Sequence, residues 1–180
     1  MASEAAEYRK LIEDLASKCV NQRVSNGQPL HAGVLLETML KRARACVSIF
    51  SGNLAPAAYD QPGVVEAASQ FMQRGGAKLR ILLQETQSRD SLMERSLVRS
   101  LDQIKTKARG TLEIKCAKGV YSTKKAHHFA VMDDHAYRFE VDHEKMQAFA
   151  NFNEPKVAKD LLAAFDQAFS MATPTLLIPG

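Results

Sequence analysis

The sequence has few cysteines and no long apolar run, and both shortages limit what the protein can be. Its three cysteines, Cys19, Cys46 and Cys116, are widely spaced and form no C-x-x-C pattern, so neither a disulfide framework nor a zinc ribbon is indicated. No segment approaches the roughly 18 consecutive apolar residues of a membrane span. Residues 1–10 lack the apolar core of a secretory or transit peptide. We therefore expect a cytoplasmic protein in a reducing compartment, outside the membrane.

The sequence also lacks internal repeats and any Pro- or Gly-rich linker that would divide it. Its 180 residues, 46% apolar and 24% charged, are close to the average soluble domain, which rules out collagen, a low-complexity tail and a disulfide miniprotein. A domain of this length buries about two thirds of its unfolded surface without a metal or a disulfide. The expected organisation is an N-terminal helix and linker over residues 1–29, one domain over residues 30–172 and a tail over residues 173–180.

The spacing of apolar residues predicts alternating helices and strands. Residues 4–19 have one apolar face, typical of a helix that docks on the domain or on a partner. Further helices are expected over residues 31–44, 64–74, 90–108 and 156–171. Strands are expected over residues 45–50, 78–83, 111–116, 126–132 and 136–141, followed by a short apolar stretch at 148–152. This order implies an α/β fold, with a mixed sheet covered by helices and right-handed crossovers.

Positive charge is concentrated in one stretch. The formal net charge is +4, but residues 105–125 alone carry +6, which leaves −2 for the rest. The basic residues of this block are Lys105, Lys107, Arg109, Lys115, Lys118, Lys124 and Lys125. Such a block next to a strand and a loop could follow a phosphate backbone. The alternative is a solvated helix end, strand rim and loop.

Histidines are clustered as well. Four of the five lie within 17 residues: His127, His128, His135 and His143. Because side chains alternate along a strand, Lys125 and His127 share one face and His128 points to the other. The two adjacent histidines therefore cannot ligate one metal ion, and the spacing matches no zinc pattern even with Asp133 and Asp134 nearby. We expect no metal and no cofactor.

The residues from His127 to Asp134, H-H-F-A-V-M-D-D, and A-N-F-N-E at residues 150–154 resemble the signature region of the phospholipase D superfamily. The family motif is H-x-K-x-x-x-x-D, followed after the next strand by Gly-Ser-x-Asn. The order of elements is similar to one family repeat over most of residues 30–171. The resemblance implies a phospholipase D-like mixed sheet sandwiched between helices, with an extra N-terminal helix.

In this register, His127 matches the nucleophilic histidine of the family, Asp134 the motif aspartate and Asn151 the motif asparagine. The match fails at the lysine position, where Phe129 stands. A phenyl ring cannot supply the ammonium that stabilises the pentacovalent transition state in family members, a loss of order 10²–10³ in rate. Residues 148–149 also differ from the Gly-Ser pair of the family.

Two hypotheses follow from this departure. In one, Lys125 replaces the missing lysine beside His127 and Asn151, and a remodelled phosphodiesterase or nuclease remains. Phosphate contacts would then come from Lys118, Lys124 and Asn153. In the other, catalysis has been lost, the protein is a pseudoenzyme, and the fold survives as a binding or assembly module.

The presence of one motif has a consequence for assembly. Family members build one active site from two motif halves, so the resemblance implies a homodimer with two copies of His127 near a twofold axis. In an active dimer, His127 would attack the phosphorus and the partner's His127 would protonate the leaving oxygen without a metal. The leading hypothesis is a domain that binds a phosphodiester, with nucleic acid as the first candidate. The alternative is a non-catalytic protein-interaction subunit whose N-terminal helix binds a partner protein.

Overall fold

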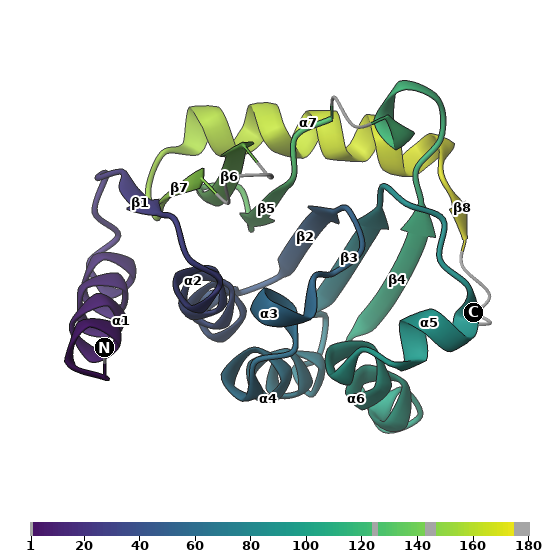
Figure 1. Cartoon of the computed structure of the whole chain (residues 1–180), viewed down its shortest axis with the longest axis horizontal. Helices are drawn as coiled ribbons and strands as arrows, with labels where there is room; N and C mark the ends of the chain where they lie inside the picture. Colours follow the sequence, from purple (N-terminus) through teal and green to yellow (C-terminus); the bar gives the residue numbers. More distant parts are fainter. Residues whose placement is uncertain (1, 124–125, 143–146, 175–180) are drawn as a thin grey trace.

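Across residues 2–123, 126–142 and 147–174, which the computed structural model describes, the chain forms an eight-stranded mixed sheet with helices on both faces (Figure 1). The strand order is β1-β7-β6-β5-β2-β3-β4-β8. The strands are β1 (Val24–Asn26), β2 (Cys46–Ser51), β3 (Lys78–Leu83), β4 (Thr111–Cys116), β5 (Phe129–Met132), β6 (Ala136–Asp142), β7 (Gln147–Asn151) and β8 (Thr173–Pro174). The predicted α/β class with a mixed sheet between helices is confirmed.

The sheet has a parallel half and an antiparallel half. Strands β2, β3 and β4 run parallel, and helices form the connections between them. Strands β5, β6 and β7 form an antiparallel meander, and β5 joins the two halves by pairing antiparallel with β2. Strands β5 and β6, which lie where two strands were expected, form a hairpin. The tail, which the sequence left unplaced, contributes β8, which pairs with the end of β4.

The helices cover the two faces of the sheet unequally. They are α1 (Ala2–Ser17), α2 (Pro29–Arg42), α3 (Pro56–Tyr59), α4 (Pro62–Met72), α5 (Arg89–Met93), α6 (Ser96–Ile104) and α7 (Pro155–Met171), with a 3₁₀ turn at Gly119–Ser122. Helix α7 lies along one face, and α2, α4 and α6 cover the other (Figure 1). Proline occupies the first turn of α2, α3, α4 and α7, where its missing N–H costs nothing.

Alternation along the strands supplies both cores. On β2, Val47 and Ile49 pack in the core under α2 and α4, whereas Phe50 belongs to the smaller core under α7. Phe165 of α7 is fully buried in that second core, where its ring stacks on Phe169 at 5.1 Å. The sheet is therefore buried on both faces, as parallel strands require.

The single helix predicted over residues 90–108 is wrong, because the structure has two helices with separate starts. The Ser88 hydroxyl caps α5 by accepting the N–H of Ser91 at 3.1 Å. The carboxylate of Asp60 accepts the N–H of Leu97 at 3.0 Å and fixes the first turn of α6. Asp60 lies 37 residues away in the sequence, so local periodicity could not detect the break.

The N-terminal helix docks on its own domain. Ile12 and Leu15 of α1 are buried in the main core. Glu37 of α2 forms ion pairs with Arg9 of α1 at 2.8 Å and with Lys41 at 2.6 Å. Burial alone would raise the pKa of the Glu37 carboxyl, but hydrogen bonds from Lys41 and Arg9 outweigh it and hold that pKa below its ordinary value. The apolar face of α1 is thus used within the chain.

Candidate functional site

The two adjacent histidines lie on opposite faces of the sheet, as the alternation predicted. His127 is exposed on the α7 side, where its ring lies 5.1 Å from that of Phe139. It lines an apolar cavity of about 560 Å³ together with Tyr121 and Leu161. His128 points to the other face, where it contacts Gln84 and Glu140. The surroundings of His127 are thus mainly aromatic and aliphatic, with no carboxylate among the described lining residues to orient its ring.

His128 belongs to a largely buried polar network. Its Nδ1 lies 3.1 Å from Oε2 of Glu140, and its Nε2 lies 3.0 Å from Oε1 of Gln84. The other carboxylate oxygen of Glu140 accepts a hydrogen bond from Arg138 at 3.3 Å. Burial would raise the pKa of Glu140, but His128 and Arg138 outweigh it and lower that pKa. Both ring nitrogens of His128 are therefore engaged inside the domain.

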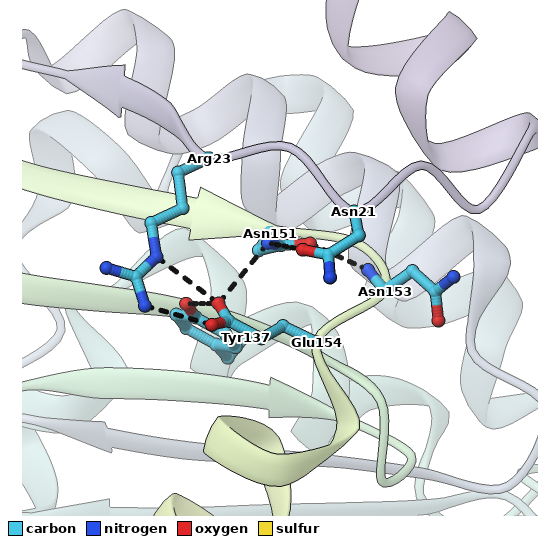
Figure 2. A network of polar contacts seen from close by, with 6 residues as sticks. All are labelled: Asn21, Arg23, Tyr137, Asn151, Asn153 and Glu154. Atoms are coloured by element: carbon cyan, nitrogen blue, oxygen red, sulfur yellow. Dashed lines mark hydrogen bonds and ion pairs between the residues drawn. The ribbon is translucent and has the colours of Figure 1, made fainter.

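Asn151, the last residue of β7, is enclosed in a second network (Figure 2). Its amide nitrogen donates to Oδ1 of Asn21 at 2.8 Å and to Oε2 of Glu154 at 3.3 Å. Its oxygen accepts the N–H of Asn153 at 2.9 Å, and its exposed fraction is 1%. The side chain of Asn153 in turn donates to the carbonyl of Cys19 at 2.7 Å. These two asparagines hold the segment after α1 against the end of β7.

Glu154 is the centre of the same network (Figure 2). Arg23 donates to its two oxygens at 2.9 and 3.3 Å, and the Tyr137 hydroxyl also donates to it. Hydrogen bonds from Arg23 and Tyr137 lower the pKa of Glu154. Burial and the bond to Glu154 raise the pKa of Tyr137 to about 12. The network connects the segment before β1 to the start of α7 and so holds these two parts of the fold together.

The two aspartates after β5 differ in their surroundings. Asp133 has φ of +52°, and its carboxylate accepts the backbone N–H groups of Arg44, Ala45 and Cys46, each at 2.9 Å. It fastens the β5–β6 turn to the start of β2. Asp134 is exposed and pairs with Lys159 at 3.5 Å and with His135 at 3.7 Å.

The three predicted catalytic residues that the structure describes, His127, Asp134 and Asn151, do not come together. His127 precedes β5 and Asp134 follows it, about 20 Å apart along an extended chain. Asn151 of β7 pairs with Tyr137 of β6, which pairs with Val131 of β5. Val131 is four residues after His127, and β7 is two strands away from β5. Asn151 therefore lies about 16 Å from His127. Lys124 and Lys125 lie outside the described residues.

The chain can now be placed among known proteins. The family model described as "Domain of unknown function (DUF7931)" matches residues 29–177. The chain belongs to the DUF7931 family. A search of curated protein sequences gives no match.

Solved structures show which fold the DUF7931 chain has. TrmBL2, described as an archaeal chromatin protein with a novel mode of DNA binding, matches 96% of the chain with a TM-score of 0.58 and 13% identity, and the chain spans 62% of its length. NucT from Helicobacter pylori matches 86% of the chain and 99% of its own, with a TM-score of 0.59 and 9% identity. The phospholipase D family member Nuc from Salmonella typhimurium matches 86% of the chain and 97% of its own, with a TM-score of 0.53 and 12% identity. The DUF7931 chain has a phospholipase D-like fold.

The basic block of the sequence is divided in the DUF7931 fold. Lys107 and Arg109 lie just before β4, and Lys118 lies just after it. Between them, Lys115 is 4.1 Å from the centre of the Phe169 ring and donates to the Phe169 carbonyl at 3.3 Å. The described part of the block therefore does not form one continuous surface.

Sequence reasoning missed five basic residues that lie near Lys107 and Arg109, at the end of the sheet where β2, β3 and β4 begin. They are Lys41, Arg42, Arg44, Arg74 and Lys78. Each lies at a helix end or at the start of a parallel strand, and that position is the signal that could have identified them. Within the described ranges, no group of three or more His, Cys, Asp or Glu side chains is placed to hold a metal ion. No helix there is long and apolar enough to cross a membrane.

Proposed function

We propose that the DUF7931 chain is a phospholipase D-like domain that binds the phosphodiester backbone of nucleic acid without cleaving it. The main observation that supports a loss of hydrolysis is that the Asp133 carboxylate accepts hydrogen bonds from three backbone N–H groups. These bonds fix Asp133 in the fold. We therefore take Asp133, and not Asp134, as the counterpart of the motif aspartate.

Taking Asp133 as the motif aspartate moves H-x-K-x-x-x-x-D by one residue. Ala126 then stands at the histidine position and His128 at the lysine position. A methyl group cannot attack phosphorus, and His128 is engaged by Gln84 and Glu140. In the register that starts at His127, Phe129 leaves the site without its cation. Under either register, the histidine–lysine pair that the chemistry needs is incomplete.

Nucleic acid is the phosphodiester that the chain's charge favours. The net charge is +4, and basic residues gather at one edge of the sheet. TrmBL2, whose description includes DNA binding, has a similar fold over 96% of this chain. The alternative, a protein-interaction subunit that uses α1, is less favoured because Ile12 and Leu15 of α1 are buried in the domain itself. The homodimer implied by the family resemblance stays a prediction.

A turnover assay with chelator tests the absence of hydrolysis. Wild-type protein, His127→Ala and His128→Ala are each incubated with labelled duplex DNA, labelled single-stranded DNA and bis(4-nitrophenyl) phosphate. We expect no product above the buffer control from any of the three proteins, while the labelled duplex is bound. Turnover by the wild type that either histidine substitution abolishes would contradict the proposal, and so would a failure to bind DNA at low salt.

A further inference from the structure

Eight basic residues gather where the parallel strands begin. They are Lys41, Arg42, Arg44, Arg74, Lys78, Lys105, Lys107 and Arg109, and all are exposed. We call this surface the basic edge. We propose that the basic edge is where the protein binds nucleic acid, and that its ligand is the backbone of a double helix. This inference rests on the proposed function and adds the surface and the form of the ligand.

The topology of the sheet brings these residues together. Parallel strands begin at one edge, and α2, α4 and α6 end at that edge, at the tails of the arrows for β2, β3 and β4 in Figure 1. Lys78, the first residue of β3, pairs with Cys46 of β2 and with Thr111 of β4. The N–H of Arg109 donates to the carbonyl of Met72 at the end of α4. Three separate segments of the sequence, residues 41–44, 74–78 and 105–109, thus contribute to one surface.

Most of this charge has no carboxylate beside it. Lys41 pairs with Glu37, and Lys105 pairs with Asp102 at 2.7 Å. The Asp133 carboxylate, which also lies at this edge, is occupied by three backbone N–H groups. Six of the eight have no ion pair with an acidic residue in the described part of the chain: Arg42, Arg44, Arg74, Lys78, Lys107 and Arg109.

Basic residues near helix C-termini can instead serve the helices, since each stabilises the helix dipole by about 0.3–1 kcal/mol. Arg74 has such a role, because it donates to the carbonyls of Ala43 and Lys41 at 2.8 and 3.0 Å. Its guanidinium group also lies over the Phe71 ring, 5.7 Å from the ring centre. No hydrogen bond from the side chain of Arg42, Lys78, Lys107 or Arg109 to a helix carbonyl is found in the described ranges. Their charge is therefore available to a ligand.

No Phe or Tyr side chain in the described part of the chain is exposed, so the basic edge lacks the rings that single-strand binding requires. Proteins that bind single strands stack bases on exposed aromatic rings. Phe71, which lies at this edge, is fully buried beneath Arg74. Exposed Lys and Arg side chains without rings suit the phosphates of a duplex, which they position without reading sequence. Five phosphate contacts predict a slope of log K against log salt near about −4.5.

Variants in which three basic residues are replaced by uncharged glutamine test the assignment. The edge variant is Arg42→Gln/Lys107→Gln/Arg109→Gln, and the matched control, Lys10→Gln/Arg89→Gln/Lys156→Gln, removes the same charge from other exposed positions. We expect the edge variant to bind a labelled duplex roughly 100-fold more weakly at 100 mM salt, with a salt slope smaller by about 3. The control should change affinity by less than about 3-fold. The wild type should also prefer the duplex over its single strand.

The outcomes separate this inference from the proposed function. If the control weakens binding and the edge variant does not, DNA binds elsewhere, and the basic edge is wrong while the proposed function stands. A lower melting temperature of the edge variant with unchanged affinity would assign these residues to helix ends and overturn the inference. A wild type that binds no DNA at low salt would overturn both. Equal or tighter binding of the single strand would overturn the assignment of a duplex.

Discussion

Replacing Asp133 by alanine is expected to lower the free energy of unfolding by about 3 kcal/mol, because three backbone N–H groups lose a charged acceptor. Each such bond alone is worth about 1.5–3 kcal/mol, and water reaches the exposed donors Arg44 and Ala45 and recovers part of the loss. Alanine is also strained at a φ of +52°. Urea unfolding followed by circular dichroism measures the change.

The neighbouring aspartate provides the control. Asp134→Ala should change stability by no more than about 0.5 kcal/mol, because its ion pairs are exposed. Asp133→Asn should fall between the two, since asparagine tolerates a positive φ and keeps one acceptor oxygen. Equal effects of Asp133→Ala and Asp134→Ala would remove the reason for taking Asp133 as the motif aspartate.

The second large effect is expected at Glu140. Glu140→Ala should destabilise the protein by about 3 kcal/mol, because it leaves the charge of Arg138 buried without its carboxylate. The side chain of Arg138 is only 6% exposed, and its Nε already lacks a partner among the described residues. His128 would lose one of its contacts at the same time. Thermal and urea unfolding measure the loss.

Two further variants distinguish the buried charge from a loss of packing. Glu140→Gln keeps the shape and an acceptor oxygen, so it should cost about 1 kcal/mol. Adding Arg138→Met to Glu140→Ala removes the unpaired charge and should recover part of the stability. A Glu140→Ala variant that is as stable as the wild type would mean that the network does not hold His128, and His128 would then become a candidate for chemistry.

The parts of the fold that local signals specify were predicted well. Strands β3 and β4 have the predicted boundaries, and the glycines that signalled them, Gly75, Gly76 and Gly110, lie just before the two strands. The helices themselves end earlier, α4 at Met72 and α6 at Ile104. Strand β5 begins at Phe129 and not at residue 126, because the N–H of Ala126 is taken by the carbonyl of Thr123 in a turn. Both histidines precede β5, yet the alternation expected of the predicted strand correctly placed His127 and His128 on opposite faces.

The candidate site was less predictable, because long-range contacts decide it. Arg23 and Glu154 are 131 residues apart in the sequence, and Asn21 and Asn151 are 130 residues apart. No periodicity reports such pairs. The register read from the sequence took Asp134 as the motif aspartate, and only the φ and the three donors at Asp133 distinguish these two consecutive aspartates. The basic edge follows from topology: its residues are scattered in sequence and meet where the parallel strands begin.

Binding of one labelled duplex, followed by fluorescence anisotropy between 50 and 200 mM salt, tests the central claim most directly. The same samples are then run on a denaturing gel. The proposal predicts a slope of log K against log salt near about −4.5, an affinity loss of about 500-fold over this range, and DNA that remains intact. A salt-independent affinity, or cleaved strands in the absence of metal, would contradict the account of a phospholipase D-like domain that binds DNA without hydrolysing it.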